Sequence, residues 1–404
     1  MKRRDILKGI SILPFAGGLA ASILPSEKIK AAPKSRKRDI YKELGVRTFI
    51  NAAGTYTFMT GSLMHDYVVD AIQSSWPEFC LLDELQDKVG EKVAAMVHSE
   101  AAVITSGAFS GLTLGLAGVL TGTDVEKVKM LPFLEGTGMK SEVICQNAHK
   151  IDYNHALTNT GCKMVYVDTV ADVEKAINEK TALLHFLNIQ ADQGQIKHEE
   201  WVALGKKYNV PTSNDMAADV PPVSNLTRFN DMGFDFVVVS GGKAIRGPQS
   251  AGILMGKKNI IEGARLHMPP RGYNIGRGMK VNKEEIIGMY VALEHFMSAD
   301  HDREFKMWES QIAVIDNALK NINGVTTRIF VPLLGNITPT LEVAWDVSTI
   351  KMTSKDLQEK LRNGDPSIEV MGHGDNAINI TVWVMRPGQE KIVAKKLKEA
   401  LSTI

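Results

Sequence analysis

The fold is decided by the stretch FVVVSGGKAIRGPQ, residues 236–249. Its first four residues form a continuous apolar run, and such a run bounded by small residues is typical of a buried strand in a parallel sheet. The two glycines that follow let the backbone approach another group closely, just beyond the end of that strand. Lys243 is therefore expected at the sheet edge where open α/β proteins bind their ligands.

A lysine in this place has two interpretations. It can be a Schiff-base nucleophile, because burial or a neighbouring cation lowers the pKa of its ammonium group and exposes the lone pair of the amine. It can equally be a surface lysine in a glycine-rich loop. The residues at the other strand ends are needed to decide between the two.

Length and composition indicate an ordinary globular protein. The chain has 404 residues, of which 44% are hydrophobic and 23% charged, so it can form two domains of usual size. The formal net charge of +1 gives no global signal for binding nucleic acid or a membrane surface. Cys80, Cys145 and Cys162 lie far apart without a CxxC pair, which argues against a zinc site and against a closed disulfide framework.

Residues 1–33 are predicted to be an export signal. Arg3 and Arg4 precede an apolar stretch at residues 10–24, which is too short for an ordinary membrane span, and small residues follow it. The paired arginines resemble the twin-arginine signal of bacteria, so we expect a periplasmic protein. An uncleaved anchor or a basic N-terminal arm are the alternatives.

The rest of the chain alternates strand and helix patterns, which predicts a mostly parallel sheet with helices on both faces. We expect an N-terminal arm and helix at residues 34–90, with residues 51–55 extended over the surface. A large domain is expected at residues 91–282, and long helices with a small C-terminal α+β domain at residues 283–404. The predicted strands of the large domain cover residues 101–104, 142–145, 163–168, 182–187, 210–214 and 236–239. Those of the small domain cover residues 325–329, 340–345, 368–371 and 378–384.

The turn after the first of these strands is a candidate phosphate site. Thr105, Ser106 and Gly107 precede a predicted helix at residues 109–120. Free N–H groups and the dipole at a helix N-terminus hold phosphate well, and nearby hydroxyls assist them. The same residues would also serve as a simple helix cap.

Two more strand ends carry groups of chemical interest. Asp215 follows one strand, and a carboxylate there can pair with a protonated ring nitrogen such as that of pyridoxal 5'-phosphate (PLP). His149 follows another strand, where its imidazole can stack on a ring or transfer a proton. A turn carboxylate and a structural histidine are the alternatives. The order of a phosphate turn, a flat residue, a carboxylate and a lysine, all at strand ends, favours the functional interpretation.

These motifs resemble one family. The residues SGGK (240–243) with GPQ (247–249), INAAGT (50–55) and AADVPP (217–222) are similar to the bacterial selenocysteine synthase, or L-seryl-tRNA selenium transferase, family. The segments DELQ (83–86), QNAH (146–149) and IGRGMKV (275–281) are similar to a tRNA-independent branch that includes D-glucosaminate-6-phosphate ammonia-lyase.

The resemblance implies the fold-type I PLP-dependent transferase fold and a homodimer or larger homo-oligomer. It implies that Lys243 holds PLP covalently and moves a proton of the substrate, and that Asp215 pairs with the pyridine nitrogen. It also places His149 over the ring, where it contributes to catalysis. The phosphate would be bound by Thr105, Ser106, Gly107 and Ser240.

Two arginines are candidates for binding an anionic group of the substrate. Arg246 lies three residues after Lys243, and Arg277 lies in a Gly-rich segment that can reach the site of a neighbouring subunit. Surface solvation is the alternative for each.

The function expected from the resemblance is an α,β-eliminating ammonia-lyase that uses PLP and acts on a small amino acid or amino-sugar acid through negative charge at its α-carbon. The alternatives are an L-seryl-tRNA selenium transferase, a PLP-dependent racemase and a non-catalytic PLP-binding protein. An export signal and a net charge near zero argue against tRNA as a partner.

Overall fold

A computed structural model describes residues 38–402. The chain divides into two units, residues 1–47 and residues 48–404. In the first, helix α1 (Ile40–Leu44) begins at Asp39, whose side chain accepts a hydrogen bond from the backbone N–H of Lys42. The predicted export signal lies outside the described residues, and no described helix is long and apolar enough to cross a membrane.

The second unit contains a seven-stranded sheet in the order β2-β8-β7-β6-β5-β3-β4. Its strands are parallel except β8, which runs antiparallel to both of its neighbours. This arrangement confirms the predicted mostly parallel sheet. The strands are β2 (Ala101–Thr105), β3 (Glu142–Gln146), β4 (Lys163–Val167), β5 (Thr181–Leu187), β6 (Thr212–Asp215), β7 (Phe236–Ser240) and β8 (Gly252–Gly256).

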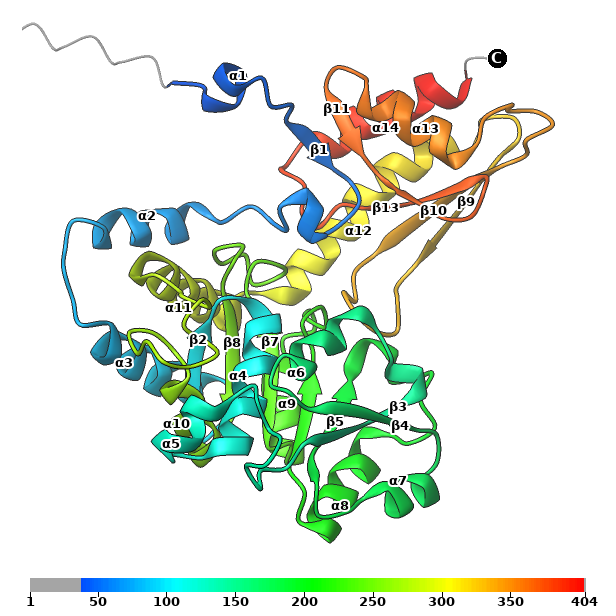
Figure 1. The fold of residues 1–404 in the computed structure, drawn as a ribbon. Helices are drawn as coiled ribbons and strands as arrows, with labels where there is room; N and C mark the ends of the chain where they lie inside the picture. Colours follow the sequence, from blue (N-terminus) through cyan, green and yellow to red (C-terminus); the bar gives the residue numbers. More distant parts are fainter. Residues whose placement is uncertain (1–37, 403–404) are drawn as a thin grey trace, which may run out of the picture. The chain divides into compact units, whose positions relative to one another are not determined.

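Helices pack against this sheet because their apolar faces need a buried partner. Helix α4 packs on β7 and β8, and α10 packs on α4. Helix α11 lies against α2 and α3 (Figure 1). The helices of this part are α2 (Asp66–Ser75), α3 (Leu82–Met96), α4 (Gly107–Thr121), α5 (Val125–Met130), α6 (His155–Thr158), α7 (Val170–Ala176), α8 (His198–Tyr208), α9 (Asn225–Met232), α10 (Lys258–Leu266) and α11 (Lys283–Ser298).

A small antiparallel sheet follows in the order β12-β13-β10-β9. Helix α12 (His301–Leu319) contacts it and packs against α14 (Gln389–Ser402), as Figure 1 shows. The predicted small α+β region is therefore present, whereas the exact domain boundaries stay a prediction. Its remaining elements are β9 (Val325–Phe330), β10 (Thr340–Trp345), α13 (Ser354–Arg362), β11 (Ser367–Glu369), β12 (Met371–Gly372) and β13 (Ala377–Thr381).

The structure differs from the expected elements in several places. Strand β8 was not predicted, and the strand expected at residues 378–384 ends at Thr381. The segment at residues 51–55 was expected on the surface, but most of it is buried and Ala52 is fully so. The reason is pairing: β1 (Phe49–Asn51) joins β11, and the Ala52 carbonyl accepts a hydrogen bond from the Thr381 N–H at 2.9 Å.

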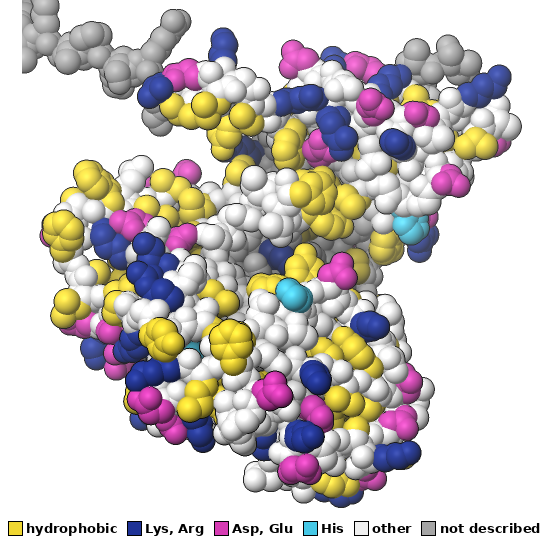
Figure 2. All heavy atoms as spheres, viewed as in Figure 1, with side chains coloured by type: hydrophobic (Ala, Val, Ile, Leu, Met, Phe, Trp, Pro, Cys, Tyr) yellow, Lys and Arg dark blue, Asp and Glu magenta, His cyan; other side chains and the backbone are white. Residues whose placement is uncertain are grey.

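Charges of both signs lie side by side on the face shown in Figure 2, where Lys and Arg side chains are interspersed with Asp and Glu. Neither positive nor negative side chains dominate this face, in keeping with the net charge of +1.

Candidate active site

The strand ends bring most of the predicted site residues to one edge of the large sheet. Thr105 ends β2 and Ser240 ends β7, and both pair with Gly252, the first residue of the strand between them. Asp215 ends β6 and pairs with Leu187, the last residue of β5. Because the parallel strands point the same way, these ends lie along one edge, as their positions in the sequence predict.

The Lys243 loop is held by the segment before α2. The Ser62 hydroxyl lies 2.6 Å from the Lys243 carbonyl oxygen and 3.0 Å from that of Gly242, and the Ser62 N–H donates to the Gly242 carbonyl at 3.0 Å. A Cβ atom at Gly242 would lie 2.4 Å from the Cα atom of Gln249, so a glycine is required there. These contacts fix the backbone from which the lysine side chain extends.

The ammonium group of Lys243 forms no hydrogen bond or ion pair among the described residues. Burial lowers its pKa, and the carboxylates of Asp215 and Asp219 act in the opposite direction. Burial raises the pKa of Asp215, which the N–H of Ala217, at 3.0 Å from Asp215 Oδ1, and the charge of Lys243 partly offset. The lysine and the two carboxyl groups therefore form one electrostatic cluster.

Asp219 was not singled out from the sequence. It is 2% exposed, and burial together with the charge of Asp215 raises its pKa to about 7. Its Oδ1 accepts a hydrogen bond from the Gly335 N–H at 3.2 Å, and its carboxyl group also bonds with Asn188. The segment 217–222 contributed to the family resemblance, but nothing in its spacing indicated a buried acid near the lysine.

His149 is completely buried after β3, in the short 3₁₀ helix η2 (Asn147–His149). Its Nδ1 accepts a hydrogen bond from the N–H of Leu187 at 3.3 Å, which leaves the proton of the neutral ring on Nε2. Nε2 is buried and has no hydrogen-bond partner among the described residues. Burial lowers the pKa of His149 to about 4, so the imidazole is neutral at physiological pH.

The predicted phosphate turn leads into α4. Gly107 has a φ of 87°, which a glycine adopts without strain. The Thr105 hydroxyl donates to the Gly107 carbonyl at 2.8 Å, and the Ser106 hydroxyl bonds to that of Ser110 at 3.0 Å. Because no side chain caps α4 at Ser106, the first N–H groups of the helix remain available to an anion.

These residues fit PLP. Lys243 offers an unpaired amine, His149 a buried N–H that lacks a partner, and α4 an uncapped N-terminus for the phosphate. Asp215 offers a buried carboxyl group at the end of the strand beside β7. The specific contact of each residue with the cofactor stays a prediction.

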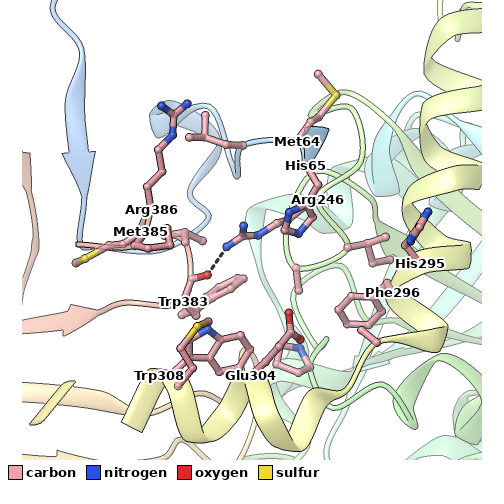
Figure 3. A pocket seen from close by; sticks show the side chains of 18 of the residues that line it. Met64, His65, Arg246, His295, Phe296, Glu304, Trp308, Trp383, Met385 and Arg386 are labelled. Atoms are coloured by element: carbon pink, nitrogen blue, oxygen red, sulfur yellow. Dashed lines mark hydrogen bonds between the residues drawn. The ribbon is translucent and has the colours of Figure 1, made fainter. Parts of the chain in front are cut away.

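Two cavities lie next to the Lys243 loop. The first, of about 430 Å³, is lined by Lys243, the segment at residues 53–56 and the small sheet; we call it the Lys243 cavity. The second, of about 600 Å³, is lined by Arg246, α12 and residues 383–387; we call it the Arg246 cavity (Figure 3). Trp383 lines both cavities. The larger cavity is the one without the lysine.

Arg246 is held in the left-handed region with a φ of 55°. Its guanidinium donates a hydrogen bond to the Trp383 carbonyl (Figure 3). Burial lowers its pKa, while the charge of Glu304 raises it, yet no carboxylate among the described residues forms an ion pair with it. Arg277, the other predicted substrate-binding arginine, is exposed and lines neither cavity of this chain.

Comparison with known proteins supports the predicted family. A family model described as "SelA: L-seryl-tRNA selenium transferase" matches residues 153–362, slightly more than half of the chain. D-glucosaminate-6-phosphate ammonia lyase of Salmonella typhimurium is 28% identical, over 89% of this chain and 97% of its own.

Solved structures agree with this result. A structure of D-glucosaminate-6-phosphate ammonia-lyase has a TM-score of 0.79 and 25% identity, and covers 91% of this chain and 99% of its own. A serine palmitoyltransferase from S. paucimobilis with a bound PLP–myriocin compound has a TM-score of 0.55 and 15% identity over 87% of each chain, which shows the fold alone. The fold is thus the predicted fold type I. The chain belongs to the L-seryl-tRNA selenium transferase family of PLP-dependent enzymes.

Proposed function

We propose that the protein is a PLP-dependent ammonia-lyase that eliminates ammonia from a small amino acid or an amino-sugar acid. The observation that carries this proposal is a partly buried, unpaired lysine in one electrostatic cluster with two buried carboxyl groups, in a chain that spans 97% of an ammonia-lyase relative. In this proposal Lys243 holds the cofactor, Asp215 faces its ring nitrogen, and His149 covers its ring. The N-terminus of α4, with Thr105, Ser106, Gly107 and Ser240, binds its phosphate.

The residues of the chain have separate tasks in such a reaction. Bound PLP supplies an electron sink that stabilises negative charge at the α-carbon of the substrate. Burial lowers the pKa of Lys243, which favours the neutral amine, the form that can take a proton at Nζ. His149 keeps one protonated nitrogen, Nε2, because Nδ1 is occupied by the Leu187 N–H. The burial of Asp215 and His149 excludes water from this edge of the sheet.

The test is spectroscopic and chemical. Purified protein should show the visible absorbance of bound PLP, and the Lys243→Ala variant should lose it. The exposed lysine variant Lys258→Ala serves as the control and should keep the band. Amino acids and amino-sugar acids are then screened for bleaching of the band with release of ammonia and a keto acid. Colourless wild-type protein would contradict every PLP-dependent function.

Selenium transfer to seryl-tRNA is the second candidate, because the matching family model carries that description. The mixed charges of the face in Figure 2 and the net charge of +1 favour a small substrate over tRNA. A filter-binding assay with seryl-tRNA distinguishes the two candidates, since only the transferase should retain the tRNA at physiological salt. Exchange of the α-proton without release of ammonia would instead indicate a racemase. PLP binding without turnover would indicate a non-catalytic protein.

We also propose a homodimer or larger homo-oligomer. Trp76, Phe79 and Leu81, between α2 and α3, are largely exposed in the single chain, and exposed apolar residues close together often mark an interface. Sedimentation of the purified protein tests this, and a monomer would contradict it.

Export by the twin-arginine route remains a proposal based on residues 1–33. Replacing Arg3 and Arg4 with lysine should keep the protein in the cytoplasm, while the unchanged chain should reach the periplasm. Cell fractionation measures both, and equal distribution of the two proteins would contradict the proposal.

A further inference from the structure

One wall of the Lys243 cavity is built by the small antiparallel sheet. Asn379 and Thr381 lie two residues apart on β13, and successive side chains of a strand point to opposite faces. Ile378 and Ile380 are fully buried on the other face, so the polar pair faces the cavity. Thr340 of β10 pairs with Thr381 and lines the same cavity. The wall is therefore a continuous strip of hydroxyl and amide groups.

Three polar atoms of this wall have no hydrogen-bond partner among the described residues. They are Thr338 Oγ1, Asn379 Oδ1 and Thr381 Oγ1, and all three are buried atoms of residues that line the cavity. Thr338 itself is only 1% exposed. Buried polar groups are nearly always paired, because an unpaired one loses its hydration without compensation. Three such groups on one wall beside Lys243 point to a ligand that supplies their partners.

The wall is fixed in place before any ligand binds. The loop between β9 and β10 bonds to the segment that follows β6: the Gly335 N–H donates to Asp219 at 3.2 Å, and the Ile337 N–H donates to the Pro221 carbonyl at 3.4 Å. Thr338 lies at the end of this loop. A fixed set of polar groups recognises a ligand with little ordering cost.

The cavity provides little positive charge. Lys243 is the one residue with an ionisable acidic or basic side chain, other than Tyr56, among the residues that line it. Arg246 lines the adjoining cavity, and its guanidinium is bonded to the Trp383 carbonyl. Phosphate monoesters are usually held by arginine, lysine or several N–H groups. Hydroxyl groups, in contrast, match this wall, because a hydroxyl can donate to an amide oxygen and can either donate to or accept from a threonine hydroxyl.

We propose that this wall, formed by Thr338, Asn379 and Thr381, binds the hydroxyl groups of a polyhydroxylated amino acid that carries no phosphate. The proposal rests on the proposed function and narrows its substrate to an unphosphorylated amino-sugar acid. The amino end of the substrate lies toward Lys243, and its hydroxylated chain lies along β13.

The test uses three probes with the PLP-bound protein: D-glucosaminate, D-glucosaminate 6-phosphate and D-serine, which lacks the hydroxylated chain. Binding is measured by calorimetry and turnover by release of ammonia. We expect D-glucosaminate to bind at least about tenfold more tightly than either of the others, because D-serine lacks the hydroxylated chain and the 6-phosphate meets no cation besides Lys243 among the residues that line the cavity.

Variants then locate the binding. Thr338→Val and Thr381→Val should each weaken D-glucosaminate binding about tenfold, the loss expected for one hydrogen bond, and leave D-serine binding unchanged. Their unfolding temperatures should equal or exceed that of the wild type, because each removes an unpaired buried hydroxyl. Thr326→Val, an exposed threonine of the same sheet outside the cavity, is the control and should change neither quantity.

The outcomes separate this proposal from the proposed function. Ammonia release from D-serine with no binding of D-glucosaminate would leave the lyase standing and overturn the substrate assignment. Tight binding of D-glucosaminate without ammonia release would support the substrate assignment and overturn the lyase function. Preference for the 6-phosphate, failure of all three probes to bind, or unchanged binding in both valine variants would overturn the assignment.

Discussion

Asp219→Asn is predicted to change how the stability of the protein depends on pH. Burial and the charge of Asp215 raise the pKa of Asp219 to about 7 from an ordinary 3.8. The folded state therefore binds a proton that the unfolded state releases between about pH 4 and 7. Stability is highest below that range and falls as the pH rises through it, because the unfolded state binds fewer protons there. Asparagine has no proton to lose, so the variant lacks this decline.

The magnitude follows from the two pKa values. Their difference corresponds to roughly 4 kcal/mol of folding free energy, at about 1.4 kcal/mol per pH unit. Between pH 5 and pH 8 the wild type loses roughly 3 kcal/mol of this free energy. The part between about pH 4 and pH 5 has already been lost at the start of the measurement. The asparagine oxygen can still accept the hydrogen bond that the Gly335 N–H donates to Oδ1, so the variant keeps the contact with the β9–β10 loop.

The assay is urea unfolding at pH 5 and pH 8, followed by tryptophan fluorescence. The stability of Asp219→Asn relative to the wild type should rise by roughly 3 kcal/mol between the two pH values. Asp70→Asn, an exposed carboxylate on α2, is the control and should follow the wild type. Parallel curves for Asp219→Asn and the wild type would refute the reasoning, because they would mean that Asp219 titrates as it does in the unfolded chain.

Three further changes test the Lys243 loop and its surroundings. Ser62→Ala should cost about 1–2 kcal/mol of stability, measured by urea unfolding, since the hydroxyl bonds to the loop carbonyls; exposed Ser74→Ala should cost less, and equal losses would contradict this. Gly242→Ala should abolish the PLP absorbance or the folded protein, because the added Cβ would lie 2.4 Å from a backbone atom; a normal absorbance spectrum would show that the loop can move. His149→Phe should leave the slope of the pH–activity profile above pH 6 unchanged, because the pKa of His149 is about 4; a lost inflection in that range would mean that His149 titrates there.

The site could be predicted from the sequence where a residue ends a parallel strand. Ser240 follows an apolar run and Asp215 ends the strand TSND, and the parallel pairing of these two strands places their ends along one edge. The prediction needed only the order of strands along the chain, because the C-terminal ends of parallel strands lie at the same edge of the sheet.

The parts of the fold and the site that the sequence did not predict depend on contacts between distant segments. Local sequence patterns do not indicate such contacts. Strand β8 follows β7 as an antiparallel neighbour, and its five residues resemble a turn because a glycine lies at each end. Asp219 becomes a buried acid only when the Gly335 loop, more than a hundred residues later, covers it. The polar residues Asn379 and Thr381 of β13 alternate with apolar ones, but only the fold brings their face beside Lys243 as a cavity wall.

The geometry of the Lys243 loop explains why two cations three residues apart line different cavities. A left-handed residue other than glycine costs roughly 1–2 kcal/mol, and Arg246 adopts that conformation with a φ of 55°. The turn is held by the Arg246 N–H, which donates to the Lys243 carbonyl at 3.1 Å, and by the Gly247 N–H, which donates to the Gly241 carbonyl at 2.9 Å. The arginine side chain then reaches the Trp383 carbonyl instead of the space around the lysine. Arg246 thereby joins the Lys243 loop to the segment that follows β13, so this contact links the lysine to the strand that carries the proposed substrate wall.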